Sequence, residues 1–484
     1  MSTKLPNSMP LPSRGKAGIP QLSTNQSFVD FMARGWEPAH LPKPIEPSAA
    51  IAAANHREKL SQTFPGQGIV VFAGHAPVRA NDNFHEFRAH SDFIYLVNAQ
   101  IEAAVLLGYP TTDGHDFELF LPVPYAPGTA DFFSNAVHGE LWVGPSHKPR
   151  DWQHAMGIPV RPIDELESAV RAGRFHAAGS VQKNELDKLN AEDSPKLKRI
   201  LSQLRMVKDA WEIAELRASV EHTIDGFRQV LTEIPQAIAA GGERWLQGTF
   251  DRAARTHGNG PGYATIIGAG IHAPTLHWTR CDGPVREDQL LLLDMGVEER
   301  SCYTADITRT FPVAGAFTDA QHQVHDLVEK SHRAGLAALA PGKPFSDFHF
   351  ACMEEIANGL HDWDLLPVSV DEALSPTGQH HRRWLVCGVG HHLGLDVHDC
   401  SHSHYEDYQG ALLEENMVLT VEPGLYFHAH DAMVPPELRG LGVRIEDDLL
   451  ITSTGYENLS GELPLDAAGL EQWMARAMNQ AVRA

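Results

Sequence analysis

The sequence predicts an α/β protein of two domains, and three observations support this prediction. The chain has 484 residues, about three times the length of a typical domain. Short apolar runs typical of buried strands alternate with helical patterns along most of the chain. Charge is densest at 196–209, which indicates a junction. We therefore expect an extended arm at 1–45, an N-terminal α/β domain at 46–204 and a second domain at 205–484.

The N-terminal half shows strands interleaved with helices. The proline-rich arm has neither a helical nor an alternating pattern. An alanine-rich stretch at 47–60 predicts a helix, and the run that begins at Gly68 predicts a buried strand. Apolar runs within 92–110 and at 117–124 predict further strands. The pattern at 163–173 indicates another helix.

The C-terminal half begins with a long amphipathic pattern that places Ile213, Leu216 and Val220 on one helix face. Beyond it, turns rich in glycine and proline separate short apolar runs. These runs predict strands at 290–296, 303–311, 417–424 and 443–452. A helix is expected at about 319–339, between the second strand and the third.

The composition narrows the class of protein. A formal net charge of −23 disfavours nucleic acid or an anionic membrane as a partner, because phosphate groups would be repelled. The five cysteines are an odd number and form no CxxC pair, which fits a reducing compartment better than a disulfide scaffold. No run has the pattern of a signal peptide or a transmembrane helix. We therefore expect a soluble, cytoplasmic protein.

Four carboxylates stand where the strand patterns predict apolar side chains: Asp294, Asp306, Glu422 and Glu446. Each one alone could face water at a strand end or pair with an arginine. Four buried carboxylates together need compensation, because an unpaired buried charge costs several kcal/mol. With the histidine-rich glycine loop at 391–405 they form the donor set of a hard divalent cation, and two such cations would balance four negative charges.

Five segments carry a specific resemblance: LLLLDMG, YTADITRTFP, CGVGHHLGLDVHD, MVLTVEPGLYF and RGLGVRIEDD. Their order and intervals resemble the signature segments of the pita-bread metallopeptidases, the family of aminopeptidase P, prolidase and methionine aminopeptidase. The resemblance runs from Arg205 to the C-terminus. Residues 78–98 are similar, more loosely, to the N-terminal domain of the proline-specific members. The resemblance thus implies a creatinase/aminopeptidase P-type α/β domain followed by a pita-bread catalytic domain, and VLTVEPGLY is closer to aminopeptidase P than to prolidase.

The resemblance implies a set of metal ligands. Position by position these are Asp294, Asp306, His391, Glu422 and Glu446. In the family pattern Asp306 and Glu446 bridge two divalent ions, Asp294 holds one, and His391 and Glu422 hold the other. An oxygen-rich site suits Mn²⁺, whereas Co²⁺ and Zn²⁺ are the alternatives, since both bind such sites more tightly on the general affinity ranking.

The resemblance also implies catalytic roles. Glu422 takes a proton from a hydroxide-forming water between the ions and passes it to the leaving amine. Histidines matching His277 and His398 stabilise the oxyanion, and Arg444 and Tyr263 orient a ligand carboxylate. From the residues alone, His277 and Tyr263 could equally be core side chains, and Arg444 could belong to a surface ion pair.

The sequence departs from the family pattern at Cys387, where the glycine loop of relatives begins with a pocket histidine. A thiol cannot replace imidazole as a cationic donor. The leading hypothesis is an Xaa-Pro aminopeptidase that acts on peptides with proline at the second position. The alternatives are a prolidase, which cuts only Xaa-Pro dipeptides, or a weakly active pita-bread binding protein. The family further implies a homodimer or a homotetramer.

Overall fold

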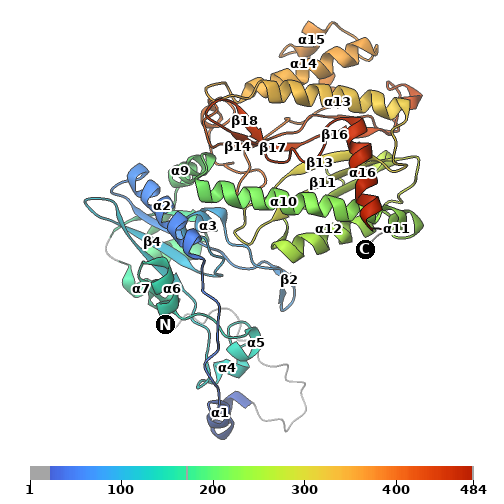
Figure 1. The fold of residues 1–484 in the computed structure, drawn as a ribbon. Helices are drawn as coiled ribbons and strands as arrows, with labels where there is room; N and C mark the ends of the chain where they lie inside the picture. Colours follow the sequence, from blue (N-terminus) through green and yellow to red (C-terminus); the bar gives the residue numbers. More distant parts are fainter. Residues whose placement is uncertain (1–21, 171–172, 482–484) are drawn as a thin grey trace. The chain divides into compact units, whose positions relative to one another are not determined.

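The computed structural model describes residues 22–170 and 173–481. It divides into two compact units, residues 1–198 and 199–484, which are considered separately below (Figure 1). Within the described residues, no helix is long and apolar enough to cross a membrane.

The N-terminal unit is built on a mixed six-stranded sheet with the order β6-β5-β4-β1-β7-β8. Strand β1 pairs antiparallel with β4 and parallel with β7, so it lies at the centre and is buried along its whole length. The elements are η1 (Leu22–Thr24), α1 (Gln26–Met32), α2 (Pro47–Thr63), β1 (Gly68–Phe72), β2 (Val78–Ala80), β3 (Asn83–Phe84), α3 (Ser91–Val97), β4 (Val105–Pro110), β5 (His115–Leu121), α4 (Asp131–Ser134), α5 (Glu140–Val143), α6 (Pro149–Met156), β6 (Val160–Pro162), η2 (Ile163–Glu165), α7 (Leu166–Ala169), β7 (Phe175–Gly179), α8 (Lys183–Leu189) and β8 (Ala191–Asp193).

Three elements of this unit differ from the sequence-based expectations. The first apolar run within 92–110 is the helix α3, not a strand, because His90 caps its N-terminus and Asn98 ends it in the left-handed conformation. The helix expected at 163–173 is a short 3₁₀ turn followed by α7, which ends at Ala169; residues 171–172 lie outside the described residues. The arm contains the helix α1, capped by Asn25.

The C-terminal unit places small antiparallel sheets between two layers of helices, as Figure 1 shows. One core joins α13 and α14 to the strands of the second half, and another joins α10, α12 and α16 to β10, β11 and β13. The elements, beginning with the helix that crosses the unit boundary, are α9 (Pro195–Met206), α10 (Ala210–Thr232), α11 (Ile234–Ala239), α12 (Gly242–His257), β9 (Gly260–Pro261), β10 (Ile266–Ala269), η3 (Gly270–His272), β11 (Leu290–Met295), β12 (Val297–Glu298), β13 (Ile307–Pro312), α13 (Asp319–Ala337), α14 (Ser346–Asp362), α15 (Val370–Leu374), η4 (His380–Arg383), η5 (Tyr405–Asp407), β14 (Val418–Val421), β15 (Gly424–Tyr426), η6 (Pro436–Leu438), β16 (Gly442–Arg444), β17 (Asp447–Ile451), β18 (Tyr456–Asn458) and α16 (Ala467–Ala481).

Two of the expected strands are interrupted at an acidic residue. The run at 417–424 breaks at Glu422, which separates β14 from β15, and the run at 443–452 breaks at Glu446, which separates β16 from β17. A backbone bridge between Thr308 and Glu446 ties this break to β13. The first half of the unit therefore meets the second half at the carboxylates that the sequence singles out.

Candidate metal centre

The four carboxylates singled out by the sequence converge in the C-terminal unit. Asp294 lies in β11, Asp306 immediately precedes β13, and Glu422 and Glu446 lie at the two strand breaks. Antiparallel pairing of β11 with β13 sets Asp294 opposite Thr308, whose backbone bridges Glu446. Asp294, Asp306 and Glu446 are buried, and Glu422 is partly buried. The antiparallel pairing thus brings together acidic groups that lie far apart in the sequence.

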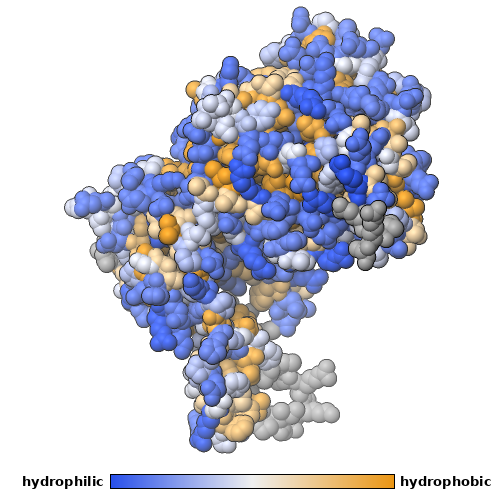
Figure 2. All heavy atoms as spheres, in the orientation of Figure 1, coloured by the Kyte–Doolittle hydropathy of each residue, from blue (hydrophilic) through white to orange (hydrophobic). Residues whose placement is uncertain are grey.

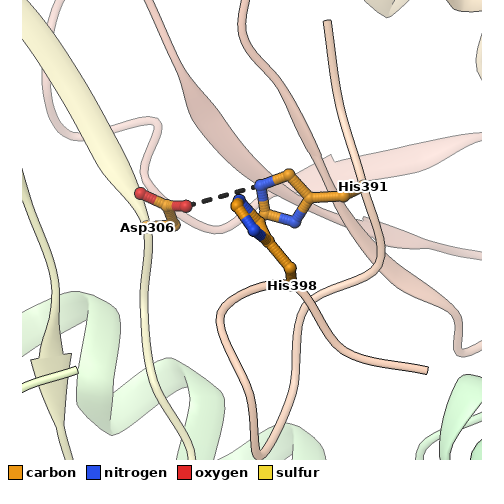
Figure 3. Close-up of side chains that lie close together, drawn as sticks. All are labelled: Asp306, His391 and His398. Carbon is orange, nitrogen blue, oxygen red and sulfur yellow. Dashed lines mark ion pairs between the residues drawn. The ribbon is translucent and has the colours of Figure 1, made fainter. Parts of the chain in front are cut away.

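His391 completes the cluster and links its parts. Three groups have ligand atoms within 4.8 Å of one another: Asp294, Asp306 and Glu446; His391, Glu422 and Glu446; and Asp306, His391 and His398. Figure 3 shows His391 and His398 approaching Asp306 from the glycine loop, and His391 Nε2 lies 3.5 Å from Asp306 Oδ2. Because Glu446 belongs to two groups and Asp306 to two, the donors can surround two adjacent positions.

The tautomer of His391 fits a ligand. Its Nδ1 lies 3.2 Å from the carbonyl oxygen of His392, to which it can donate, and this leaves the Nε2 lone pair facing the carboxylates. Nε2 is also 3.5 Å from Glu422 Oε1. Imidazole nitrogen beside carboxylate oxygens is a donor set that divalent transition metals accept.

Burial and the charges of neighbouring carboxylates raise the pKa values of Asp294, Glu422 and Glu446. Burial and then the charge of Asp306 raise the pKa of Glu422 to about 7 and that of Glu446 well above its usual range. Burial also raises the pKa of Asp294, although Arg444 opposes the shift. The cluster therefore favours positive charge, whether from protons or from cations.

Two buried atoms that make no hydrogen bond test whether a metal fits. These are Glu446 Oε1 and His391 Nε2, and the latter faces oxygens of Asp306 and Glu422, each at 3.5 Å. A buried polar atom without a partner costs about 1–3 kcal/mol, so both atoms need a ligand. Both belong to the same group of metal-compatible donors. The residues present thus fit divalent cations.

Arg444 holds the cluster from one side. Its guanidinium donates to Asp294 Oδ2, to the Tyr426 hydroxyl oxygen at 2.9 Å and to Thr308 Oγ1 at 3.1 Å. The Tyr263 hydroxyl donates to Asp294 Oδ1 at 2.6 Å. Both oxygens of Asp294 therefore accept a hydrogen bond, which fixes the orientation of its carboxylate.

Sequence reasoning missed two members of this network, Thr308 and Tyr426. Thr308 Oγ1 donates to Glu446 Oε2 at 2.7 Å while it accepts from Arg444, so it links the guanidinium to that carboxylate. A threonine in a strand is ordinary, and nothing in its spacing marks it. Only the structure identifies Thr308, through the backbone bridge that joins it to Glu446, a residue far away in the chain.

The two expected catalytic histidines lie at the exposed side of the cluster. The ring of His398 is 4.3 Å from that of His391, centroid to centroid, and inclined at 76°. Burial lowers the pKa of His398, and the nearby His391 and His277 lower it further. Both His277 and His398 are exposed to solvent, whereas His391 is largely buried. The histidines thus form a rim through which a substrate can reach the carboxylates.

Cys387 lies beside Glu422 at the start of the glycine loop. It is partly buried against the core of α13 and α14. Burial and then the charge of Glu422 raise the pKa of the Cys387 thiol to about 11, so it is neutral at physiological pH. His392, by contrast, is a packing residue: its ring lies against Phe345 and Tyr408, and burial lowers its pKa to about 3.

Comparison with known proteins identifies the family. Residues 214–453 match the model of metallopeptidase family M24, and residues 53–176 match that of the aminopeptidase P N-terminal domain. Xaa-Pro aminopeptidase 2 of Streptomyces coelicolor is 41% identical over 467 residues, which cover 94% of this chain and 97% of the relative. The chain belongs to the aminopeptidase P family of M24 metallopeptidases. The Xaa-Pro aminopeptidase of Escherichia coli is 30% identical, with 87% and 96% of the two chains covered.

Solved structures of this family share the fold. A glutamate-to-alanine variant of Escherichia coli aminopeptidase P in complex with substrate has a TM-score of 0.79 and 28% identity, with 90% and 100% of the chains covered. Proline aminopeptidase P II from Yersinia pestis has a TM-score of 0.76 and 30% identity, with 88% and 99% covered. These findings confirm the expected fold, the expected family and the expected metal-dependent, proline-specific exopeptidase.

Proposed function

We propose that the carboxylate and histidine cluster is the catalytic centre of this Xaa-Pro aminopeptidase. The ligands would be Asp294, Asp306, His391, Glu422 and Glu446. The observation that carries the proposal is the pair of overlapping donor groups that share Glu446, in which one buried atom of Glu446 and one of His391 make no hydrogen bond. Two divalent cations held by these residues would supply the positive charge that acidifies a water molecule and stabilises a developing oxyanion.

The residues of the chain then have distinct tasks. Glu422 removes a proton from the attacking water and returns it to the proline nitrogen as the carbon–nitrogen bond breaks. His277 and His398 lie at the rim, where they can donate hydrogen bonds to the carbonyl oxygen as it gains negative charge. Arg444 and Tyr263 keep the carboxylate of Asp294 in one orientation.

We propose Mn²⁺ as the metal, bound as two ions per chain. Four carboxylates and one imidazole form an oxygen-dominated donor set, which hard cations prefer. Co²⁺ and Zn²⁺ are the alternatives, because the general affinity order places both above Mn²⁺. Elemental analysis of the chain purified from its own host tests the identity and the number of the ions.

The substrate range is tested with an Xaa-Pro-Xaa tripeptide beside an Xaa-Pro dipeptide. We expect Mn²⁺-loaded protein to cleave the tripeptide, because the relatives that match most of this chain are Xaa-Pro aminopeptidases rather than dipeptidases. Metal-stripped protein should cleave neither peptide, and adding Mn²⁺ should restore activity. Chromatography of the released N-terminal residue measures the hydrolysis of both peptides.

Each other outcome of this assay has a clear meaning. Cleavage of the dipeptide alone would identify a prolidase. Cleavage of neither peptide by protein that carries the full metal complement would indicate a changed substrate or a binding role, and Cys387 would then be the first residue to examine. Activity of the metal-stripped protein would refute the metal mechanism.

Cys387→His tests the departure from the family pattern. The neutral thiol beside Glu422 offers no cationic donor to a substrate, whereas imidazole can donate. We expect the variant to raise kcat/KM for the tripeptide by about tenfold, the size of one hydrogen bond to a charged group. Cys387→Ser is the matched control, since it is small and uncharged. Unchanged or lower kcat/KM in the histidine variant would show that the cysteine suits another substrate.

We also propose that the chain forms a homodimer or a homotetramer in the cytoplasm. Figure 2 shows hydrophobic residues among polar ones in the part of the N-terminal unit that holds α1, α4 and α5, where Phe31 is 71% and Trp142 50% exposed. Large exposed apolar patches are often sites of interaction with other proteins. Sedimentation of the full chain distinguishes a monomer from the proposed assembly.

The proposed location in the cytoplasm is consistent with the cysteines. All five are free thiols, which is typical of a reducing compartment.

A further inference from the structure

His277 is carried by a loop that leaves the sheet after β10 and returns before β11. The loop has little regular structure beyond the 3₁₀ turn η3, and its backbone makes short local bonds such as that from the Thr279 amide to the His277 carbonyl. His277 itself is exposed. A side chain on such a loop needs an anchor elsewhere if it is to keep a fixed position beside the metal centre.

Glu243, in the first turn of α12, supplies that anchor. Its Oε1 accepts from the Ala269 amide and from His272 Nδ1, each at 2.8 Å. Its Oε2 accepts from Trp278 Nε1 at 2.8 Å and from the Gly283 amide at 2.7 Å. Two of these donors are backbone groups, one at the end of β10 and one within the loop, and two are side chains within the loop.

The carboxylate of Glu243 is fully buried, at 0% exposure. A loss of its oxygens would leave the two buried backbone donors, the Ala269 and Gly283 amides, without an acceptor, and would release the partly buried side chains of His272 and Trp278. The helix N-terminus favours the negative charge, and the Glu243 amide donates back to the Gly283 carbonyl at 2.9 Å. The His272 ring is stacked on Trp278 at 3.9 Å, which ties the two side-chain donors together.

Trp278 is the neighbour of His277 in the chain, so the bond from its indole fixes the backbone next to the histidine. The guanidinium carbon of Arg280 lies over the Trp278 ring, 4.3 Å from its centroid. We propose that Glu243 is a positioning residue that holds the loop of His277 in the geometry needed for hydrolysis. This inference rests on the proposed role of His277, and Glu243 itself does not touch the reacting atoms.

A double-mutant cycle tests the proposal. In Glu243→Gln the amide group faces four donors with one oxygen, so the loop loses its fixed position. We expect kcat for the tripeptide to fall about 10- to 100-fold, as misplacement by about 1 Å predicts, with KM and metal content nearly unchanged. In a His277→Ala background the same substitution should lower kcat less than about twofold. An equal loss in both backgrounds would overturn the proposal.

A second measurement does not depend on activity. Arg280 is a trypsin site in the loop, and its side chain is 68% exposed. Glu243→Gln should be cleaved after Arg280 at least about fivefold faster than the parent chain, because local opening becomes easier. The exposed Glu287 provides the control Glu287→Gln, which should change neither kcat nor this cleavage. Unchanged cleavage after Arg280 in Glu243→Gln would overturn the anchor.

A milder variant covers the case in which Glu243→Gln does not fold. Trp278→Phe keeps an aromatic ring against His272 but removes one of the four donors. It should change kcat and trypsin cleavage in the same direction by a smaller factor; no change in either would count against the proposal. If His277→Ala alone retains full kcat, the proposed role of His277 fails, and the proteolysis result then decides whether Glu243 holds the loop.

Discussion

Replacing Asp306 with alanine is expected to abolish peptide hydrolysis and metal binding together. Asp306 belongs to two of the metal-compatible groups, one with Asp294 and Glu446 and one with His391 and His398. Its removal deletes a shared ligand and leaves the remaining donors unable to surround two ions. We expect kcat to fall by about 1,000-fold or more and the metal content per chain to drop. Steady-state kinetics and elemental analysis of the same preparation measure both effects.

The control for this experiment is Asp288→Ala, which removes a carboxylate at an exposed position of the same unit. It should retain full activity and full metal content. Thermal unfolding of both variants separates loss of the site from loss of the fold. Full metal occupancy in Asp306→Ala would refute the assignment of Asp306 as a ligand, even if the variant were inactive.

Most of the proposed ligands can be predicted from the sequence. Burying a charge is costly, so an acidic residue inside an apolar strand pattern indicates a functional site. Asp294, which follows four leucines, and Glu446, which interrupts the strand pattern at 443–452, contradict the local pattern, and such contradictions point to function. The same signal fails for polar residues that suit a strand. Thr308 connects Arg444 to Glu446. Because threonine is uncharged and common in strands, its presence in the sequence does not indicate this role.

Glu243 and α3 show two further limits of the sequence. Glu243 looks like an ordinary acidic residue in a first helical turn, and only the tertiary structure places the four donors around it. Residues 93–97 are all apolar and α3 is entirely buried, so the hydrophobic pattern does not distinguish a helix from a strand. The side chain of His90 caps the N-terminus of the helix, but histidine is not among the preferred capping residues, so the sequence does not predict this cap.

Replacing Arg309 with methionine is expected to cause the largest loss of stability in the C-terminal unit. Arg309 and Asp447 are fully buried and joined by a bond of 2.6 Å. The guanidinium also donates to four carbonyl oxygens, those of Thr308, Glu446, Leu463 and Pro464. Removing one partner of a buried pair costs about 3–5 kcal/mol, because the other charge remains in the core. Urea unfolding followed by tryptophan fluorescence measures the loss.

The environment of Asp447 explains why the loss is so large. Burial alone would raise the pKa of Asp447, but Arg309 and the nearby His332 outweigh it and hold that pKa below its usual range. Without Arg309, the carboxylate must stay charged in the core or take up a proton, and both cost free energy. Arg309→Met with Asp447→Leu should therefore be more stable than Arg309→Met alone.

An exposed pair provides the matched comparison. Arg217 and Glu457 form a two-bond ion pair whose side chains are 45% and 44% exposed, so water stabilises either partner when the other is lost. Arg217→Met should lower the free energy of unfolding by less than about 1 kcal/mol. A similar loss for both arginines would mean that desolvation of Asp447 does not set the stability lost on removal of Arg309.

The Arg309 guanidinium also donates to the backbone carbonyl of Glu446. A large loss at Arg309 alone would therefore link the stability of this core to the placement of a proposed metal ligand.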